Sequence, residues 1–570
     1  MTLWNVWNTA VVQRRVAGEG NLSANSSLHR CNKHYMKTQS PSVPGGNFPV
    51  PAKSTTPLLA LRCSQAIRPY LPEDTGNTDG SVAILIDTPV VFSHISNAAA
   101  ITIANPASPG SLSVTVNVDG KTLTTGTVPL NATKHALTFS LSSLTPRKAA
   151  YSISCTATHS SQTFHATGSL TYLPALPSGI GSVTKMDQRT GALLARPANG
   201  KGGAYAPVFP IGFYTQFDNY LATDFTIPAK LKSQGFTVIH PVPDFANMTA
   251  FDLVLDKMQD AGIYLMYDMR NTYMNSTSVT TQVNHIKSRP NLLLWYTGDE
   301  PDGTSDPLNA TVTASNLITS LDGGDGVGGA GYHPVSLVLN CQDYQFNSYA
   351  AGSDIVMQDA YTIGNNVTFS TVWGTPCTTD YGDCGCDNCK GSFADISTRM
   401  DEFKDRLFIN GWDRTKAVWT VPQGFGNDTY VCSRFPTGKE FVVESVVGMN
   451  HGGLGVVSWD DPTSAEIKAS ASALALALPN MTSFILSPRA TFKQVTTNGI
   501  DAGMWTIGSQ TLVLASNTNY ASVVLRLQDL GFPATVGSIT QVFNSGTEVD
   551  SARFHLIFES VGSGGFIVQK

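Results

Sequence analysis

Two adjacent carboxylates, Asp299 and Glu300, are the residues of this chain that are best placed to do chemistry. They follow the apolar run 292–296, which has the length and composition of a buried strand, and Pro301 comes directly after them. Proline has no backbone donor and biases the preceding residue toward an extended conformation, so we expect it to end the strand and to fix the direction of Glu300. Paired acids are what general acid–base catalysis requires. The alternative is a strand followed by a solvated acidic turn.

Strand-like and helix-like segments alternate along residues 200–480. The predicted strands are 209–214, 237–242, 264–268, 292–296, 335–339, 354–358, 417–421 and 455–459, and the clearest helical patterns cover 253–261, 308–321 and 393–408. Eight strand–helix units match a (β/α)8 TIM barrel in count and length. Because chemistry in that fold lies at the carboxyl ends of the strands, we expect the Asp299–Glu300 pair to lie at the catalytic end of a barrel over 200–480.

The predicted strand ends supply a ring of acids, amides and aromatic rings. Asp359 follows the sixth strand, and we predict substrate contacts from Tyr214, Asp268, Asn340, Tyr361, Gln423, Trp459 and Asp460. The ring has no cluster of histidines, and the chain shows no Ser-His-Asp order, phosphate loop or dinucleotide fingerprint, so we predict neither a metal nor another cofactor. Carboxylates with nearby aromatic rings are the equipment of glycoside hydrolysis. The alternative for the tryptophans is packing within the barrel core.

Two segments, FPIGFY at 209–214 and WYTGDEP at 295–301, resemble the clan A (β/α)8 glycoside hydrolases. The resemblance implies that Glu300 is the proton donor and that Asp299 replaces an asparagine that contacts the sugar. The clan's nucleophile lies at the end of strand 7, where this chain has Gln423, which cannot serve. Asp359 is the nearest substitute, about 10 Å away at the usual strand spacing, so retaining and inverting reactions both stay open.

Two further interpretations compete with this one. The Gly298-Asp299-Glu300 sequence resembles the family 20 hexosaminidases, and residues 452–459 are similar to the strand 8 segment of the family 18 chitinases. That resemblance implies a substrate-assisted reaction in which Asp299 orients the acetamido group that acts as nucleophile. Its weakness is that the chitinases' spaced Asp-x-Asp-x-Glu is missing. The third interpretation is a non-catalytic carbohydrate-binding or cell-wall protein, which Gln423 at strand 7 favours.

The barrel is predicted to lie between two β-rich regions. Residues 81–175 consist of short alternating runs separated by turn residues, which is typical of a β-sandwich, and 141–151 resembles the loop-to-strand corner of fibronectin- or immunoglobulin-like modules. The strand-like pattern of residues 485–570 predicts a second sandwich-like module. Residues 1–80 are rich in Ser, Asn, Pro and Thr, and their composition predicts a disordered or linker-like region.

Composition and sequons favour a secreted protein. The net charge of -6 over 570 residues gives no electrostatic case for nucleic acid or an anionic membrane, and no apolar run reaches the roughly 18 residues that would span a bilayer. We therefore predict a monomeric secreted glycoprotein with a polysaccharide or oligosaccharide substrate. Asn-x-Ser/Thr sequons occur at Asn21, Asn25, Asn131, Asn247, Asn275, Asn309, Asn366, Asn427 and Asn480.

Four of the nine cysteines fall within 377–389, a Gly- and Asp-rich segment without helix or strand pattern. Two disulfides there are favoured over a zinc site, because the paired C-x-x-C spacing of zinc ribbons is missing. The loop follows the sixth strand, so we expect it to form a rigid wall of the active site. An odd cysteine count leaves one unpaired, and Cys31 in the N-terminal region is the candidate.

Overall fold

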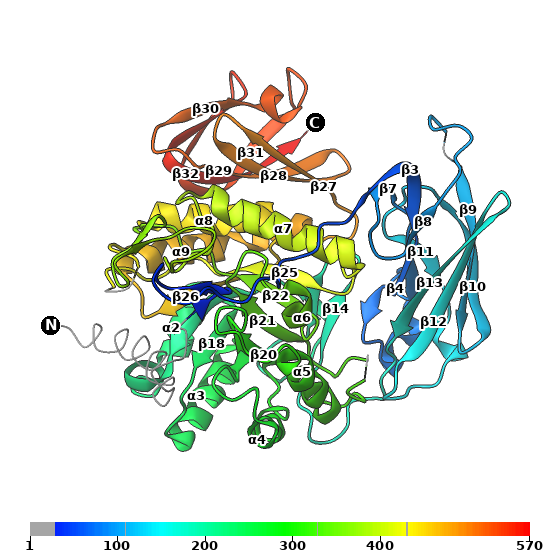
Figure 1. Ribbon diagram of the computed structural model, residues 1–570, viewed down its shortest axis with the longest axis horizontal. Helices are drawn as coiled ribbons and strands as arrows, with labels where there is room; N and C mark the ends of the chain where they lie inside the picture. Colours follow the sequence, from blue (N-terminus) through cyan, green and yellow to red (C-terminus); the bar gives the residue numbers. More distant parts are fainter. Residues whose placement is uncertain (1–28, 109, 328, 429–430, 570) are drawn as a thin grey trace.

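The computed structural model describes residues 29–108, 110–327, 329–428 and 431–569. They form an N-terminal β-sandwich beside a central barrel, and a C-terminal β-sheet module covers another side of the barrel (Figure 1). The predicted fold class, a TIM barrel between two β-rich modules, is confirmed. No helix within the described residues is long and apolar enough to cross a membrane.

The N-terminal module packs two antiparallel sheets face to face. Burial alternates along β9 and β12, so one side of their sheet faces the core, whereas β4 and β6 of the other sheet are buried along their whole length. The Cys63–Cys155 disulfide joins β4 to β12 across the core. The predicted corner at 141–151 is confirmed, because the Tyr151 hydroxyl donates to the Thr145 carbonyl at 2.6 Å. One sheet has the order β10 (Lys121–Pro129), β9 (Ser111–Val118), β12 (Tyr151–His159), β13 (Gln162–Leu170), and the other the order β11 (His135–Thr138), β6 (Ala83–Asp87), β4 (Arg62–Gln65).

The predicted linker over 1–80 is wrong for its described part. Strands β3 (Lys53–Ala60), β4 and β5 (Ile67–Arg68) belong to sheets, and β3 pairs with β7 (Val90–Ser93) and β8 (Ala98–Ala100). Leu59, Leu61 and Ile67 lie in the sandwich core. Thr55 and Thr56, which contributed to the linker-like composition, are exposed on β3, whereas Ser64 of β4 is buried. Residues 1–28 lie outside the described residues.

All eight predicted barrel strands are present and pair in parallel in chain order. They are β17 (Ile211–Gln216), β18 (Val238–Val242), β19 (Tyr264–Asp268), β20 (Leu292–Asp299), β21 (Val335–Leu339), β22 (Ile355–Gln358), β25 (Ala417–Thr420) and β26 (Val456–Asp461). Tyr214, Met266, Leu294 and Trp419 fill the interior, which is therefore a packed core and not a pore.

The helices lie outside the barrel, where α2 to α8 connect successive strands and α9 and α10 follow the last strand. They are α2 (Ile227–Ser233), α3 (Met248–Ala261), α4 (Ser276–Ile286), α5 (Ala310–Leu321), α6 (Phe346–Ala350), α7 (Ala394–Asn410), α8 (Gly438–Asn450), α9 (Ala465–Ala477) and α10 (Pro479–Ile485). The predicted helices at 253–261, 308–321 and 393–408 correspond to α3, α5 and α7.

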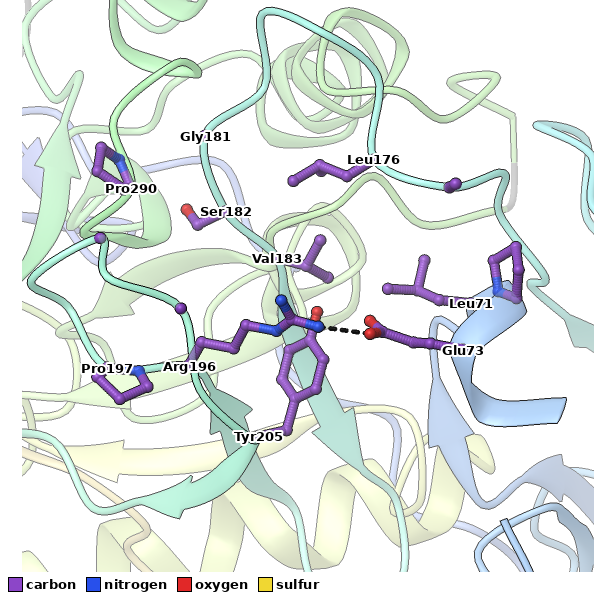
Figure 2. A pocket seen from close by; sticks show the side chains of 14 residues that line it. Leu71, Glu73, Leu176, Gly181, Ser182, Val183, Arg196, Pro197, Tyr205 and Pro290 are labelled. Atoms are coloured by element: carbon purple, nitrogen blue, oxygen red, sulfur yellow. Dashed lines mark hydrogen bonds and ion pairs between the residues drawn. The ribbon is translucent and has the colours of Figure 1, made fainter. Parts of the chain in front are cut away.

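A four-stranded sheet closes the amino-terminal end of the barrel. Met186 and Leu193 from this sheet join the barrel core. Its order is β16 (Ala206–Val208), β15 (Ala192–Ala195), β14 (Thr184–Asp187), β5. A cavity of about 390 Å³ opens nearby, lined by Leu176, Tyr205 and the ion-paired side chains of Arg196 and Glu73 (Figure 2). This cavity lies at the wrong end of the strands for barrel chemistry.

A Ser-His-Asp contact borders the same cavity, although the sequence analysis found no catalytic triad. Ser182 Oγ lies 2.9 Å from His333 Nε2, and His333 Nδ1 lies 3.0 Å from Asp322 Oδ1. The same hydroxyl donates to the carbonyls of Arg289 and Leu292, both at 3.1 Å. Since a serine has one hydroxyl hydrogen, these carbonyls compete for it, and the contact fastens the segment before β14 to the barrel.

The C-terminal module packs on helix α8, which explains why that helix is buried on nearly every side. Phe441 and Met449 share a core with Trp505 and Leu512, so α8 is buried between the barrel and the sheet, as Figure 1 shows. The sheet has the order β27 (Thr491–Thr497), β28 (Ile500–Ile507), β29 (Gln510–Asn517), β32 (His555–Gln569), β30 (Val523–Arg526), and β31 (Ser538–Asp550) pairs with β32.

Candidate active site

Glu300 and Asp359 meet at the carboxyl end of the barrel, after strands β20 and β22. They are 7% and 2% exposed. Burial is the main reason that the pKa of Asp359 lies well above its ordinary value, and the charge of Glu300 and a hydrogen bond between the two side chains raise it further. Two acids in contact cannot both ionise easily, because the charge of the first disfavours ionisation of the second.

The backbone of Glu300 corrects the expectation of an extended residue before Pro301. Its φ of 54° is left-handed. This conformation is disfavoured for a residue with a side chain and before a proline, so it stores strain. Two hydrogen bonds hold the turn: the Glu300 amide donates to the Val338 carbonyl at 3.2 Å, and the Glu300 carbonyl accepts from the Gly303 amide at 2.9 Å. The Glu300 side chain is thereby directed by a tight turn and not by an extended strand.

Asp302 is a third buried acid beside the pair, which the sequence analysis did not single out. Burial raises its pKa to about 7, and the charge of Glu300 adds to the effect, although amide donors oppose it. Those donors are the amides of Cys341 at 2.9 Å and Asn340 at 3.3 Å. Asp302 thus fixes the end of β21 next to the pair. Its position after Asp-Glu-Pro was the available signal.

Asn340, predicted to contact substrate, lies against the acid pair. Its side-chain amide donates to Asp359 Oδ1 at 3.2 Å, and its backbone carbonyl accepts from Arg399. Asn340 therefore orients Asp359. Tyr361 comes two residues after Asp359; burial raises its pKa, and the charge of Asp359 raises it further.

Arg30 is a basic residue of the site that sequence reasoning missed. It lies on β1 (His29–Arg30), forms an ion pair with Glu300, and points Nε at Asn340 Oδ1 at 3.4 Å. The Cys31–Cys341 disulfide fixes this segment to the end of β21. The prediction that Cys31 is unpaired is therefore wrong, and the free cysteine is the buried Cys432. A contact across 310 residues left no local signal.

The cysteine loop contains the two predicted disulfides, Cys377–Cys384 and Cys386–Cys389, so these four thiols do not form a zinc site. All four half-cystines line a cavity of about 420 Å³ that also reaches Arg30 and Asn340. Arg30 contacts Glu300 and Asn340 contacts Asp359, so the cavity approaches the acid pair through these two residues, although neither acid lines it. The expected wall of the active site therefore stays a prediction.

A second cluster of polar side chains surrounds Arg270 near the carboxyl ends of the barrel strands. Arg270 bonds Asp268 at 2.7 Å and Asp299 at 2.9 Å, and the Tyr296 hydroxyl donates to Asp299 at 2.7 Å. His240 Nε2 lies 2.7 Å from Asp268. Both carboxylates are thus engaged within the protein. The guanidinium also lies over aromatic rings, 4.9 Å from that of Trp459 and 5.2 Å from that of Tyr214.

The remaining predicted residues lie beside these clusters or below the surface. Gln423 is buried, and its amide group exchanges hydrogen bonds with the backbone of Ile363 at 2.9 and 3.1 Å, so it fixes the loop after β22. Burial raises the pKa of Asp460 to about 7, and the charge of Asp461 adds to the shift. Ser464 caps helix α9.

Known proteins resemble this chain in architecture only. No family model and no curated protein matches the sequence. A GH30 endoxylanase from Clostridium papyrosolvens C71 has 9% identity and a TM-score of 0.38 over 64% of this chain and 97% of that chain. A protein described as a glycoside hydrolase has 12% identity and a TM-score of 0.42 over 69% and 97%. A β-glucuronidase of Parabacteroides merdae has 9% identity and a TM-score of 0.30 over 90% and 74%.

Proposed function

We propose that this protein is a glycoside hydrolase in which Glu300 and Asp359 carry out the chemistry. The observation that carries the proposal is the contact of these two buried acids at the carboxyl end of a TIM barrel, beside a cavity of about 420 Å³. Glycoside hydrolysis needs one protonated carboxyl and one carboxylate at the same pH. A coupled pair that retains one proton provides both.

The surroundings of the pair favour a definite division of roles. Burial and the negative charge of Glu300 keep the proton on Asp359, whereas the Arg30 guanidinium stabilises Glu300 as a carboxylate. Asp359 is then the proton donor and Glu300 the nucleophile. These roles are the reverse of those that the resemblance to clan A implied for the two residues.

The close contact of the carboxyls supports a retaining reaction, because an inverting pair leaves room for a water molecule between the acids. In the first step Asp359 gives its proton to the glycosidic oxygen while Glu300 forms a bond to the anomeric carbon and the sugar–oxygen bond breaks. In the second step the Asp359 carboxylate takes a proton from water. The resulting hydroxide oxygen bonds to the anomeric carbon and displaces Glu300.

The neighbouring cavity suits a hydrophilic sugar chain. Amide, hydroxyl and charged side chains line it, among them Asn340, Thr378, Asn388 and Lys390. An oligosaccharide or polysaccharide offers hydroxyl groups to such a surface. Four disulfides also favour an oxidising compartment, so we place the protein outside the cell.

The substrate-assisted alternative requires a free Asp299 to orient an acetamido group. Asp299 Oδ1 already accepts from Tyr296, and Oδ2 accepts from Arg270. An acetamido group would have to compete with a buried ion pair, which counts against this mechanism. The Glu300–Asp359 contact is the better supported catalytic pair.

The test is a screen of polysaccharides and aryl glycosides with the wild-type protein and two variants, Glu300→Ala and Asp359→Ala. Each variant should lose at least a hundredfold in turnover, while Asp343→Asn, an acid after the neighbouring strand β21, should retain it. Added azide should rescue both variants but yield opposite anomers of the glycosyl azide, with inversion in the nucleophile variant. The proposal is contradicted if hydrolysis survives both substitutions, or if the wild-type protein hydrolyses no substrate in the screen.

A further inference from the structure

The first described residues form a strap, defined here as residues 29–48, across the carboxyl end of the barrel. Its hairpin of β1 and β2 (Lys33–His34) lies against the cysteine loop: the His34 carbonyl accepts from the Gly382 amide at 2.9 Å, and Lys33 donates to Asn388 at 2.7 Å. Farther along, the Gly46 carbonyl accepts from the Gln345 amide at 2.7 Å. Several separate contacts thus hold the strap on the catalytic face.

We propose that Arg30 is a positioning residue of the active site, which keeps Glu300 ionised and aligns Asn340 on Asp359, and that the Cys31–Cys341 disulfide holds it in place. The part played by the two acids in catalysis rests on the proposed function. The effect of Arg30 on their protonation does not, because it depends on charges that are present without a sugar.

The geometry joins Arg30 to both acids. Its side chain is 14% exposed and that of Glu300 is 9% exposed, so their ion pair is shielded from water and its interaction is stronger than on the surface. Its Nε points at Asn340 Oδ1, and the amide of the same asparagine donates to Asp359. A planar guanidinium makes both contacts at once, which an ammonium does less well.

The charges that face the pair explain why a cation is needed. Glu300 and Asp359 face a third acid, Asp302, from the same turn and a phenol, Tyr361, from the loop after β22. Each negative charge makes the next ionisation harder. Arg30 lowers the pKa of both Asp359 and Asp302 against burial and this mutual repulsion. Losing Arg30 therefore shifts every ionisation in the cluster to higher pH.

The Cys31–Cys341 disulfide fixes the position of Arg30 relative to Asn340. Cys31 follows Arg30 and Cys341 follows Asn340, so the covalent bond joins the immediate neighbours of two residues that touch. Because the bond closes a loop of 310 residues, it restricts how far the strap can move from the end of β21.

The first test is an infrared titration of the protein without substrate. The carbonyl stretch of a protonated carboxyl that disappears in Asp359→Asn reports on Asp359. Its midpoint should rise by roughly one to three pH units in Arg30→Gln and return near the wild-type value in Arg30→Lys. Lys33→Gln is the matched control, because it removes an ion pair of the same hairpin with Asp387 and leaves Arg30 in place. An unchanged midpoint in Arg30→Gln overturns the proposal.

The second test compares two disulfide deletions on the same face. The double variant Cys31→Ser, Cys341→Ser should raise the midpoint in the direction of Arg30→Gln, whereas Cys377→Ser, Cys384→Ser should not. Equal behaviour of the two double variants overturns the role of the tether. A shifted midpoint together with failure of every glycoside in the screen would leave Arg30 in its role and remove the proposed function. Hydrolysis together with an unshifted midpoint would leave the proposed function in place and remove the role of Arg30.

Discussion

Arg30 forms an ion pair with Glu300 although 270 residues separate them in the chain. The contact places a cation from the N-terminal strap against an acid at the end of strand β20. A buried acid pair needs such a charge, because burial alone would keep both carboxyls protonated. The N-terminal strap and the barrel therefore form one site.

The pH dependence of activity should follow the protonation of the pair. Activity requires the Glu300 carboxylate and the Asp359 proton, so the rate should fall on the acidic side when Glu300 is protonated and on the alkaline side when Asp359 loses its proton. Because burial and Glu300 raise the pKa of Asp359, we expect the alkaline limb of kcat to lie well above the usual range of aspartic acids. An alkaline limb whose midpoint lies near pH 4 contradicts this assignment.

Asp302→Asn should move that alkaline limb to lower pH. The charge of Asp302 raises the pKa of Asp359, so removing it makes the Asp359 proton easier to lose, by roughly half a unit to one unit. An asparagine also turns an amide donor toward the Cys341 or Asn340 amide, and the lost hydrogen bond should cost about 1–3 kcal/mol in unfolding free energy. A pH–rate profile and urea unfolding measure the two effects separately.

The sequence predicted the barrel because each strand is an apolar run with its own boundaries. Segments 264–268 and 335–339 agree residue for residue with β19 and β21. Helix α3 starts five residues before the predicted 253, because Asn247 caps it by accepting from the Ala250 amide at 3.0 Å. The capping signal was present in the sequence, where Asn247 was counted only as a glycosylation sequon.

The site was harder to predict because its contacts are long-range. Glu300 and Asp359 could be placed near each other from strand order, and the structure brings them into contact. Arg30 lies in a segment whose composition suggests a linker, and the pairing of Cys31 with Cys341 cannot be deduced from nine cysteines. The left-handed φ of Glu300 also runs against the local preference before proline, so tertiary contacts decide it.

Arg270→Met should destabilise the barrel strongly. Arg270 neutralises Asp268, whose side chain is fully buried, and Asp299, which is 13% exposed. Removing the shared cation leaves two buried charges without it, which should lower the free energy of unfolding by roughly 3–5 kcal/mol. Arg196→Met is the control: it breaks a pair with Glu73 in which both side chains are 44% exposed, and the cost should stay below about 1 kcal/mol. Similar urea midpoints for the two variants would count against the role of Arg270.

His451 should couple the stability of the C-terminal module to pH. Burial alone would lower its pKa, but hydrogen bonds to Asp401 and Asp501, at 2.8 Å each, raise it from 6.5 to about 9. A group whose pKa is raised on folding stabilises the fold fully below its unfolded pKa and loses that effect as the pH rises through the folded pKa. The contribution of roughly 2–3 kcal/mol should therefore be present below pH 6.5 and fade up to about pH 9.

The measurement for this linkage is urea unfolding of His451→Gln and wild type between pH 6 and pH 10. The difference in unfolding free energy should shrink with rising pH, because the wild type loses its imidazolium while the glutamine does not titrate. His285→Gln serves as the control, since that histidine is exposed and pairs with Asp252 on the surface, where such pairs contribute little. A difference that stays constant across this range would show that His451 is neutral in the fold, and that its two aspartates hold the module by hydrogen bonds alone.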